Sequence, residues 1–253
     1  LSPTLVGVGA EPRQIYPYFP EYHLARWLRE ETGEEIPVWC LHKAGARTLW
    51  EDYRLLVDRL AIDGILLVDG GVDSLVRGDE AAKGTFVEDA VSLYAVDRLT
   101  DVPTRLLACV AFGAEEDLAH AHVLENVAAL TRSGDFLGAC ALLPQMESYQ
   151  AFERAVLAVH AQPLHDASVI NASLISAVRG HYGDYHLTEK TRGSRLWISP
   201  LMTLYWCFEM EAVARRNLFL SRLEHTRTFR DAMLSVMEFL GDRPTRPPFR
   251  IPL

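Results

Sequence analysis

Residues 64–80 read GILLVDGGVDSLVRGDE, and this stretch decides the fold class. Its first five residues are apolar or glycine without alternation, which is typical of a strand covered on both faces of a parallel sheet. The strand runs into two adjacent glycines, followed by acids and a serine. Ligands of open α/β sheets bind beyond the carboxyl ends of the strands, so we expect this loop to line a ligand crevice.

The rest of the chain repeats this alternation of short apolar runs and amphipathic stretches, which predicts an α/β fold with a mainly parallel sheet flanked by helices. Buried strands are predicted over residues 36–41, 64–68, 105–112, 136–143 and 196–199. Helices are predicted over residues 20–31, 48–61, 86–99, 120–131, 149–160, 168–179 and 228–240, with Ser168 as an N-cap and Gly180 as a stop signal.

No linker, low-complexity block or repeat divides the chain, so we expect a single α/β domain over residues 1–253. The missing initiator methionine predicts that a native N-terminal segment precedes Leu1. Residues 200–208 are apolar and are interpreted as core.

Composition excludes several classes of protein. Of the 253 residues, 49% are hydrophobic and 23% are charged, which is ordinary for a globular protein. The net charge of -9 argues against a nucleic-acid partner, which needs clustered cations. No apolar run has the length of a membrane span. The four cysteines are far apart in apolar stretches, which predicts free thiols and a cytoplasmic location. Formation of a homo-oligomer is left open.

The stretch after the residue 64–68 strand is strongly acidic. Between positions 69 and 89 there are only two cations, Arg77 and Lys83, against six acids, namely Asp69, Asp73, Asp79, Glu80, Glu88 and Asp89. Clustered acids repel one another unless a cation joins them, and a divalent metal such as Mg²⁺ prefers oxygen ligands. We therefore expect a metal held by Asp69, Asp73, Asp79 and Glu80. The alternative is a turn whose aspartates cap local backbone N–H groups.

The paired glycines suggest a phosphate contact in the same loop. The backbone of Gly70 and Gly71, with Ser74 and Arg77, could bind a phosphate or carboxylate. Residues 70–74 are similar to the Ser-Gly-Gly-x-Asp-Ser loop of ATP pyrophosphatases. Asp69 stands where that loop has its first serine, and Gly78 interrupts the helix that should follow.

Two further polar clusters are candidate parts of the site. His122 and Glu125 share one face of the predicted helix over residues 120–131, and they could form a metal ligand with its orienting partner, an acid–base pair or a surface hydrogen bond. The turn at residues 180–186 supplies Asp184 and His186, and Arg192 and Asn171 lie nearby in sequence as candidate ligand contacts. A turn packed on aromatic residues is the alternative there.

Several of these segments together resemble the prokaryotic family known as domain of unknown function 1152. The resemblance is carried by residues 69–80, Gly84-Thr85 with Glu88-Asp89, residues 120–126 with Leu130-Thr131, Asn171 with Ser173, residues 183–186, and Pro200-Leu201-Met202 through Trp206. It implies a Rossmann-like α/β fold and assigns no activity. Relatives often carry a glycine-rich segment ending in Asp near the N-terminus, and only residues 7–9 are comparable here.

The expected function is that of a metal-assisted enzyme. It would act on a phosphate-bearing small molecule or nucleotide as a hydrolase or a phosphate- or nucleotidyl-transfer enzyme. Asp73, His122, Glu125 and His186 are the expected catalytic residues. The alternatives are a non-catalytic nucleotide or small-ligand sensor or scaffold, and an adenylating enzyme similar to ATP pyrophosphatases.

Overall fold

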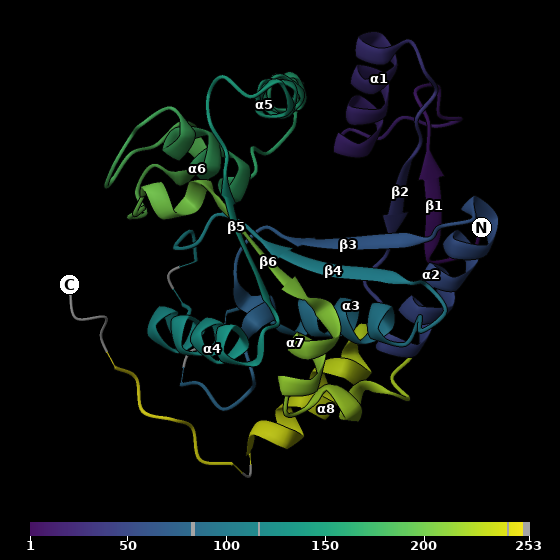
Figure 1. Cartoon of the computed structure of the whole chain (residues 1–253). Coiled ribbons are helices and arrows are strands. Elements are labelled where there is room, and N and C mark those ends of the chain that lie inside the picture. Colours follow the sequence, from purple (N-terminus) through teal and green to yellow (C-terminus); the bar gives the residue numbers. More distant parts are fainter. Residues whose placement is uncertain (82–83, 116, 242, 250–253) are drawn as a thin grey trace. The chain divides into compact units, whose positions relative to one another are not determined.

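The computed structural model of the chain describes residues 1–81, 84–115, 117–241 and 243–249. Lys83, one of the two cations in the acidic stretch, lies outside these ranges. The chain divides into two compact units (Figure 1). The first unit comprises Leu1–His42 and Ala141–Thr203, and the second comprises Lys43–Cys140 and Leu204–Leu253. The single domain expected from the sequence stays a prediction.

The second unit is built on a mixed four-stranded sheet in the order β3-β4-β6-β5. Its strands are β3 (Gly64–Asp69), β4 (Thr104–Cys109), β6 (Leu204–Glu209) and β5 (Phe136–Ala141). β3 and β4 are parallel, whereas β6 runs antiparallel to β4. The α/β class is confirmed, but the mainly parallel, Rossmann-like arrangement is not.

The antiparallel strand comes from a segment that the sequence analysis interpreted as core. β6 occupies residues 204–209 and places Phe208, which is fully buried, opposite Leu107 of β4. The strand expected at residues 196–199 is absent from the described elements, and Ile198 forms only an isolated bridge with Gly183. Both stretches are apolar, so hydrophobicity alone did not distinguish the strand from the buried loop.

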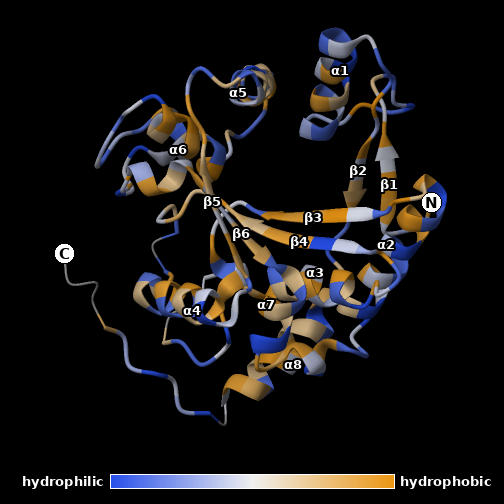
Figure 2. Ribbon diagram, viewed as in Figure 1, coloured by the Kyte–Doolittle hydropathy of each residue, from blue (hydrophilic) through white to orange (hydrophobic). Residues whose placement is uncertain are grey.

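The helices of the second unit supply most of its core. They are α2 (Ala46–Leu60), α3 (Val87–Asp97), α4 (His120–Ser133), α7 (Met210–Arg216) and α8 (Phe229–Gly241). α3 is buried along most of its length and packs against α2, α7 and α8, while α7 contacts β4. Figure 2 shows apolar colouring on most of β3 and β4, with the polar residues of β4 at its start.

β3 is not covered on both faces, contrary to the expectation from its continuous apolar sequence. Exposure alternates along the strand, and Leu66 and Val68 are about half exposed. The strand ends at Asp69, which is buried. This end, where β3 and β4 finish side by side, positions the candidate site.

The first unit contains a two-stranded antiparallel sheet and three helices. β1 (Leu5–Val8) pairs with β2 (Val38–Leu41), and the helices are α1 (Pro20–Thr32), α5 (Glu147–His160) and α6 (Val169–Val178). Ser168 caps α6 as expected, since its hydroxyl accepts a hydrogen bond from the backbone N–H of Asn171 at 3.3 Å. Gly180 has a φ of 84°, as expected for a residue that follows the end of a helix.

Within the described residues, no helix combines the length and the apolar content needed to cross a bilayer.

Candidate functional site

Four acids gather at the carboxyl ends of β3 and β4. Asp69 is the last residue of β3 and lies opposite Cys109 in the parallel register. Asp73 begins the 3-10 helix η1 (Asp73–Leu75), and Asp89 lies in the first turn of α3. Glu115 follows β4. Because parallel strands end at the same edge of a sheet, segments that are distant in sequence meet there.

Three of these acids are close enough to share one ion. Carboxylate oxygens of Asp69, Asp73 and Asp89 all lie within 4.8 Å of one another. Asp69 and Asp73 are buried, and Asp89 is partly buried. Oxygen atoms from several carboxylates at this spacing match the ligands that Mg²⁺ and Ca²⁺ prefer.

The carboxyl groups of this cluster hold their protons unusually firmly. Burial, and then the charge of Asp73, raises the pKa of Asp69 to about 6. Burial and the charges of Asp69, Asp73 and Glu115 raise the pKa of Asp89 to about 9, and burial with the charge of Asp73 raises that of Glu115 to about 8. At neutral pH Asp89 is therefore protonated, and a side-chain hydrogen bond joins it to Asp73.

Backbone and side-chain donors fix the orientation of the acids. The N–H of Ser74 donates to Asp69 Oδ2 at 3.0 Å, and both the N–H and the hydroxyl of Thr85 donate to Asp73 Oδ2 at 3.1 Å. The N–H of Val72 donates to Glu115 Oε2 at 3.2 Å. The local capping hydrogen bonds of the alternative interpretation are therefore present. The same turn also brings the acids close to one another.

The glycine loop does not form the expected phosphate cradle on its own. The N–H groups of Val72 and Ser74 bind carboxylates of the protein itself. Ser74 is buried, and its side chain also hydrogen-bonds Asp69. At Gly71 a Cβ would lie 2.5 Å from Glu115 Oε1, so the glycine permits the close approach of that carboxyl group. Gly70 is exposed.

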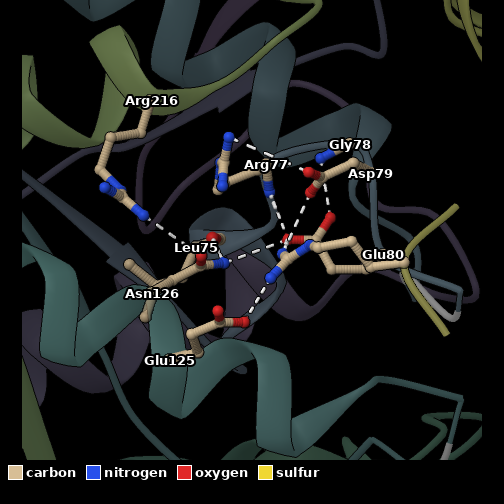
Figure 3. A network of polar contacts seen from close by, with 9 residues as sticks. Leu75, Arg77, Gly78, Asp79, Glu80, Glu125, Asn126 and Arg216 are labelled. Atoms are coloured by element: carbon tan, nitrogen blue, oxygen red, sulfur yellow. Dashed lines mark hydrogen bonds and ion pairs between the residues drawn. The ribbon is translucent and has the colours of Figure 1, made fainter. Parts of the chain in front are cut away.

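Asp79 and Glu80 lie apart from this cluster, in a separate ion-pair network (Figure 3). The side chain of Glu80 is fully buried and accepts hydrogen bonds from the N–H groups of Arg77 and Gly78 at 2.9 and 2.8 Å. Arg246 lies 3.1 Å from Glu80 and 3.0 Å from Asp79. Burial raises the pKa of Glu80, but these donors outweigh it and hold the pKa below its ordinary value.

The expected pair of His122 and Glu125 is not formed by a direct contact in the described residues. Glu125 is exposed and pairs with Arg246. His122 is buried, its ring lies 5.0 Å from that of Phe249, and its Nδ1 lacks a hydrogen-bond partner among the described residues. Their neighbour Asn126 instead donates to Leu75 O at 2.9 Å and to Glu80 Oε1 at 3.1 Å.

The remaining candidate residues belong to the first unit. His186 lies 3.2 Å from Asp184 and 2.8 Å from the hydroxyl of Thr191, while Asp184 also accepts a hydrogen bond from the N–H of Leu196. Arg192 pairs with Glu189. Asn171 lines a separate cavity of about 390 Å³ between α1, α5 and α6. The shared site expected for these residues and the acidic loop stays a prediction.

Sequence reasoning missed two members of the cluster. Asp89 was counted among the acids of the stretch but was not assigned as a ligand, and Glu115 was not considered. A signal for Glu115 existed, because it follows the strand predicted over residues 105–112, and the strands of a parallel sheet all end at the same edge. No sequence signal indicated that Asp79 and Glu80 would turn away toward Arg246.

The family of the chain follows from comparison with known proteins. A family profile described as Protein of unknown function (DUF1152) matches residues 22–241. The chain belongs to this family. All four acids of the cluster lie within the matched part of this DUF1152 chain, whereas Arg246 lies beyond it. No curated protein and no solved structure matches the chain.

Proposed function

We propose that this DUF1152 protein is a divalent-metal-assisted enzyme that acts on a phosphate-bearing small molecule or nucleotide at the acidic cluster. The observation that carries the proposal is the convergence of Asp69, Asp73 and Asp89, with ligand atoms within 4.8 Å of one another. Buried carboxyl groups with raised pKa values indicate a place where negative charge is not neutralised by the described residues. A hard divalent cation such as Mg²⁺ supplies that neutralisation.

The chemistry of the proposal follows from the groups present. A bound cation would polarise a phosphoryl oxygen and lower the pKa of a coordinated water. Asp69, Asp73 and Asp89 would hold the ion, and Asp89 would lose its proton on binding. Glu115, whose pKa is about 8, is suited to accept or donate a proton near neutral pH. In this proposal Glu115 takes the acid–base role that the sequence analysis gave to His122, Glu125 and His186.

Two finer expectations belong to the same proposal. A Rossmann-like relationship is supported by the parallel pair β3–β4 and by acids at its carboxyl edge. A cytoplasmic location is supported by four free cysteines, of which Cys140 is exposed.

The adenylating alternative has less support than metal-assisted phosphate chemistry. A pyrophosphate loop must offer free N–H groups to an anion, whereas the N–H groups of Val72 and Ser74 already bind carboxylates. Asp69 would also place its own charge beside the phosphate. A ligand sensor without turnover is favoured by one observation, that Glu125 is paired with Arg246 rather than with His122.

The metal is tested by calorimetric titration of the full chain with Mg²⁺ and Mn²⁺ at pH 8. We expect saturable binding by the wild type, and a loss of about tenfold or more in affinity for Asp73→Asn, which retains an oxygen acceptor for Thr85. Asp63→Asn is the matched control, because Asp63 is exposed and precedes the opposite end of β3. Equal affinity of the wild type and Asp73→Asn would disprove the metal site.

Turnover is tested separately with ATP, GTP and sugar nucleotides in the presence of the bound metal. Release of phosphate or of a nucleotide by the wild type, and its loss in Glu115→Gln with metal affinity retained, would support an enzyme in which Glu115 transfers a proton. A thermal shift with a nucleotide but without product would support the sensor instead. Release of pyrophosphate but no single phosphate from ATP, with the adenylyl group recovered as AMP or on an added acceptor, would support the adenylating alternative.

A further inference from the structure

A hollow of about 260 Å³ on the second unit borders the ion-pair network of Figure 3. Three arginines line it, namely Arg77, Arg132 and Arg216, together with Glu125, Asn126, Ala128 and Ala129. A second hollow of about 430 Å³ shares Ala129, Arg132 and Arg216 with the first. The arginines come from three segments, the acidic loop, α4 and the end of α7.

Two of these guanidinium groups are not neutralised within the protein. Among the described residues, neither Arg132 nor Arg216 has a carboxylate within ion-pair distance, and the polar contact of Arg216 is with Asn126 Oδ1 at 3.4 Å. Burial and the charges of Arg77, Arg132 and Arg246 lower the pKa of Arg216. Arginines rarely crowd together in this way without an anion, because like charges repel.

Two acids lie near the hollow, and each has a partner within the protein. Glu125 pairs with Arg246, and Asp135, which lines the second hollow, accepts a hydrogen bond from the hydroxyl of Ser133. The side-chain amide of Asn126 donates to Leu75 and Glu80, so its oxygen is turned toward Arg216 (Figure 3). The hollow therefore has three arginines and one acid in its lining, on a protein whose net charge is -9.

We propose that this hollow binds a phosphate group, free or in a small phosphoester, through the guanidinium groups of Arg77, Arg132 and Arg216. Guanidinium groups match phosphate oxygens in paired hydrogen bonds, and a dianion would relieve their mutual repulsion. The volume of the hollow is several times the roughly 30 Å³ that one water molecule occupies in the liquid. This leaves room for an organic group beside the phosphate. This site does not depend on the acidic cluster or on the function proposed for it.

The test is calorimetric titration of the full chain with inorganic phosphate and with phenyl phosphate, in EDTA so that no metal contributes. We expect saturable binding, weakened about tenfold or more in Arg132→Gln and in Arg216→Gln, since each change removes charged hydrogen bonds. Arg59→Gln removes the same charge from an exposed position that lines neither hollow, and it should bind as the wild type does. Asp73→Asn should also retain phosphate affinity, which separates this site from the acidic cluster.

Thermal unfolding distinguishes a binding role from a structural one. Without phosphate, Arg216→Gln should unfold at the same or a higher temperature than the wild type, because the change relieves repulsion among the arginines. Arg132 is exposed, so Arg132→Gln tests binding even if Arg216→Gln fails to fold. Tighter binding of phenyl phosphate would assign the site to an ester, and equal affinity would assign it to free phosphate. Absence of saturable binding by the wild type at millimolar phosphate, or equal weakening in Arg59→Gln, would overturn the proposal.

Discussion

Asp69 and Glu80 are buried carboxylates of one short stretch of chain, yet their pKa values move in opposite directions. The pKa of Asp69 is raised to about 6, and that of Glu80 is lowered. Burial opposes the charged form in both cases. The difference lies in their partners, because Glu80 accepts hydrogen bonds from two backbone N–H groups, Asn126 and Arg246, whereas Asp69 lies beside another carboxylate.

This contrast separates acids that are paired within the fold from the acids of the cluster proposed to bind a metal. The network around Glu80 joins the acidic loop to α4 and to Arg246 near the end of the described chain. Each of its acids pairs with Arg246, and in this sense we call it the balanced group. The cluster of Asp69, Asp73 and Asp89 lacks such balance among the described residues, and protons take the place of a cation. Both groups would be counted simply as acids by composition.

Among the substitutions compared at pH 7, the largest effect is expected when the balanced group is broken. Glu80→Gln should lower the free energy of unfolding by about 3 kcal/mol, because Arg246 would keep its charge and the donors of Arg77 and Gly78 would lose their anionic acceptor. Urea unfolding at pH 7, followed by tryptophan fluorescence, measures this loss.

Asp89→Asn provides the matched comparison from the other group. It removes a carboxyl group that is already protonated at neutral pH, so it should change the stability by less than about 1 kcal/mol at pH 7. If both variants lost equal stability, the distinction between a balanced and an unbalanced group of acids would be wrong.

The pH dependence of stability distinguishes the two groups of acids in a second way. Asp89 and Glu115 keep their protons in the folded chain up to pH values of about 9 and 8, whereas in the unfolded chain they lose them near pH 4. The folded state therefore binds more protons between these limits, and stability falls as pH rises, by about 1.4 kcal/mol per pH unit for each group.

The midpoints of urea unfolding at pH 6, 7.5 and 9 measure this fall. If Mg²⁺ binds the acidic cluster as proposed, adding Mg²⁺ should restore most of the stability lost at pH 9. Glu80 acts in the opposite sense, because its lowered pKa contributes stability that is lost only as pH falls through the acidic range. Stability that did not decrease between pH 6 and 9 would contradict the raised pKa values of Asp89 and Glu115.

Much of the secondary structure was predictable because it depends on local patterns. The helices expected over residues 20–31 and 149–160 are found at Pro20–Thr32 and Glu147–His160, and Ser168 caps α6 as its position predicts. β3 was also predictable from five apolar or glycine residues before an acid. β6 and the direction of its pairing were not, because a buried loop and a buried strand have the same composition.

The location of the candidate site was predictable from the sequence, but only some of its residues were. Asp69 and Asp73 follow a strand directly, so the edge of the sheet indicated them. Glu80 and Asp79 share that stretch but turn to Arg246, a residue more than 160 positions later in the chain. Such a contact depends on tertiary packing that no local pattern records. Asp89 was missed for the same reason, since it reaches the cluster from α3, whereas the position of Glu115 after a predicted strand was a signal that was not used.

The smallest effect should come from Gly71→Ala, which acts on Glu115 beside the unbalanced group. The new Cβ would approach Glu115 Oε1 to 2.5 Å, and the flexible end of that side chain can move away. We expect a loss of roughly 1 kcal/mol or less, because the contact of Glu115 with the N–H of Val72 is lost while the core is unchanged. The more telling change is in the pH dependence, which should become shallower because a displaced Glu115 would ionise nearer its ordinary pKa. A Gly71→Ala variant that kept the full wild-type slope would show that the carboxyl group of Glu115 does not depend on the space left by the glycine.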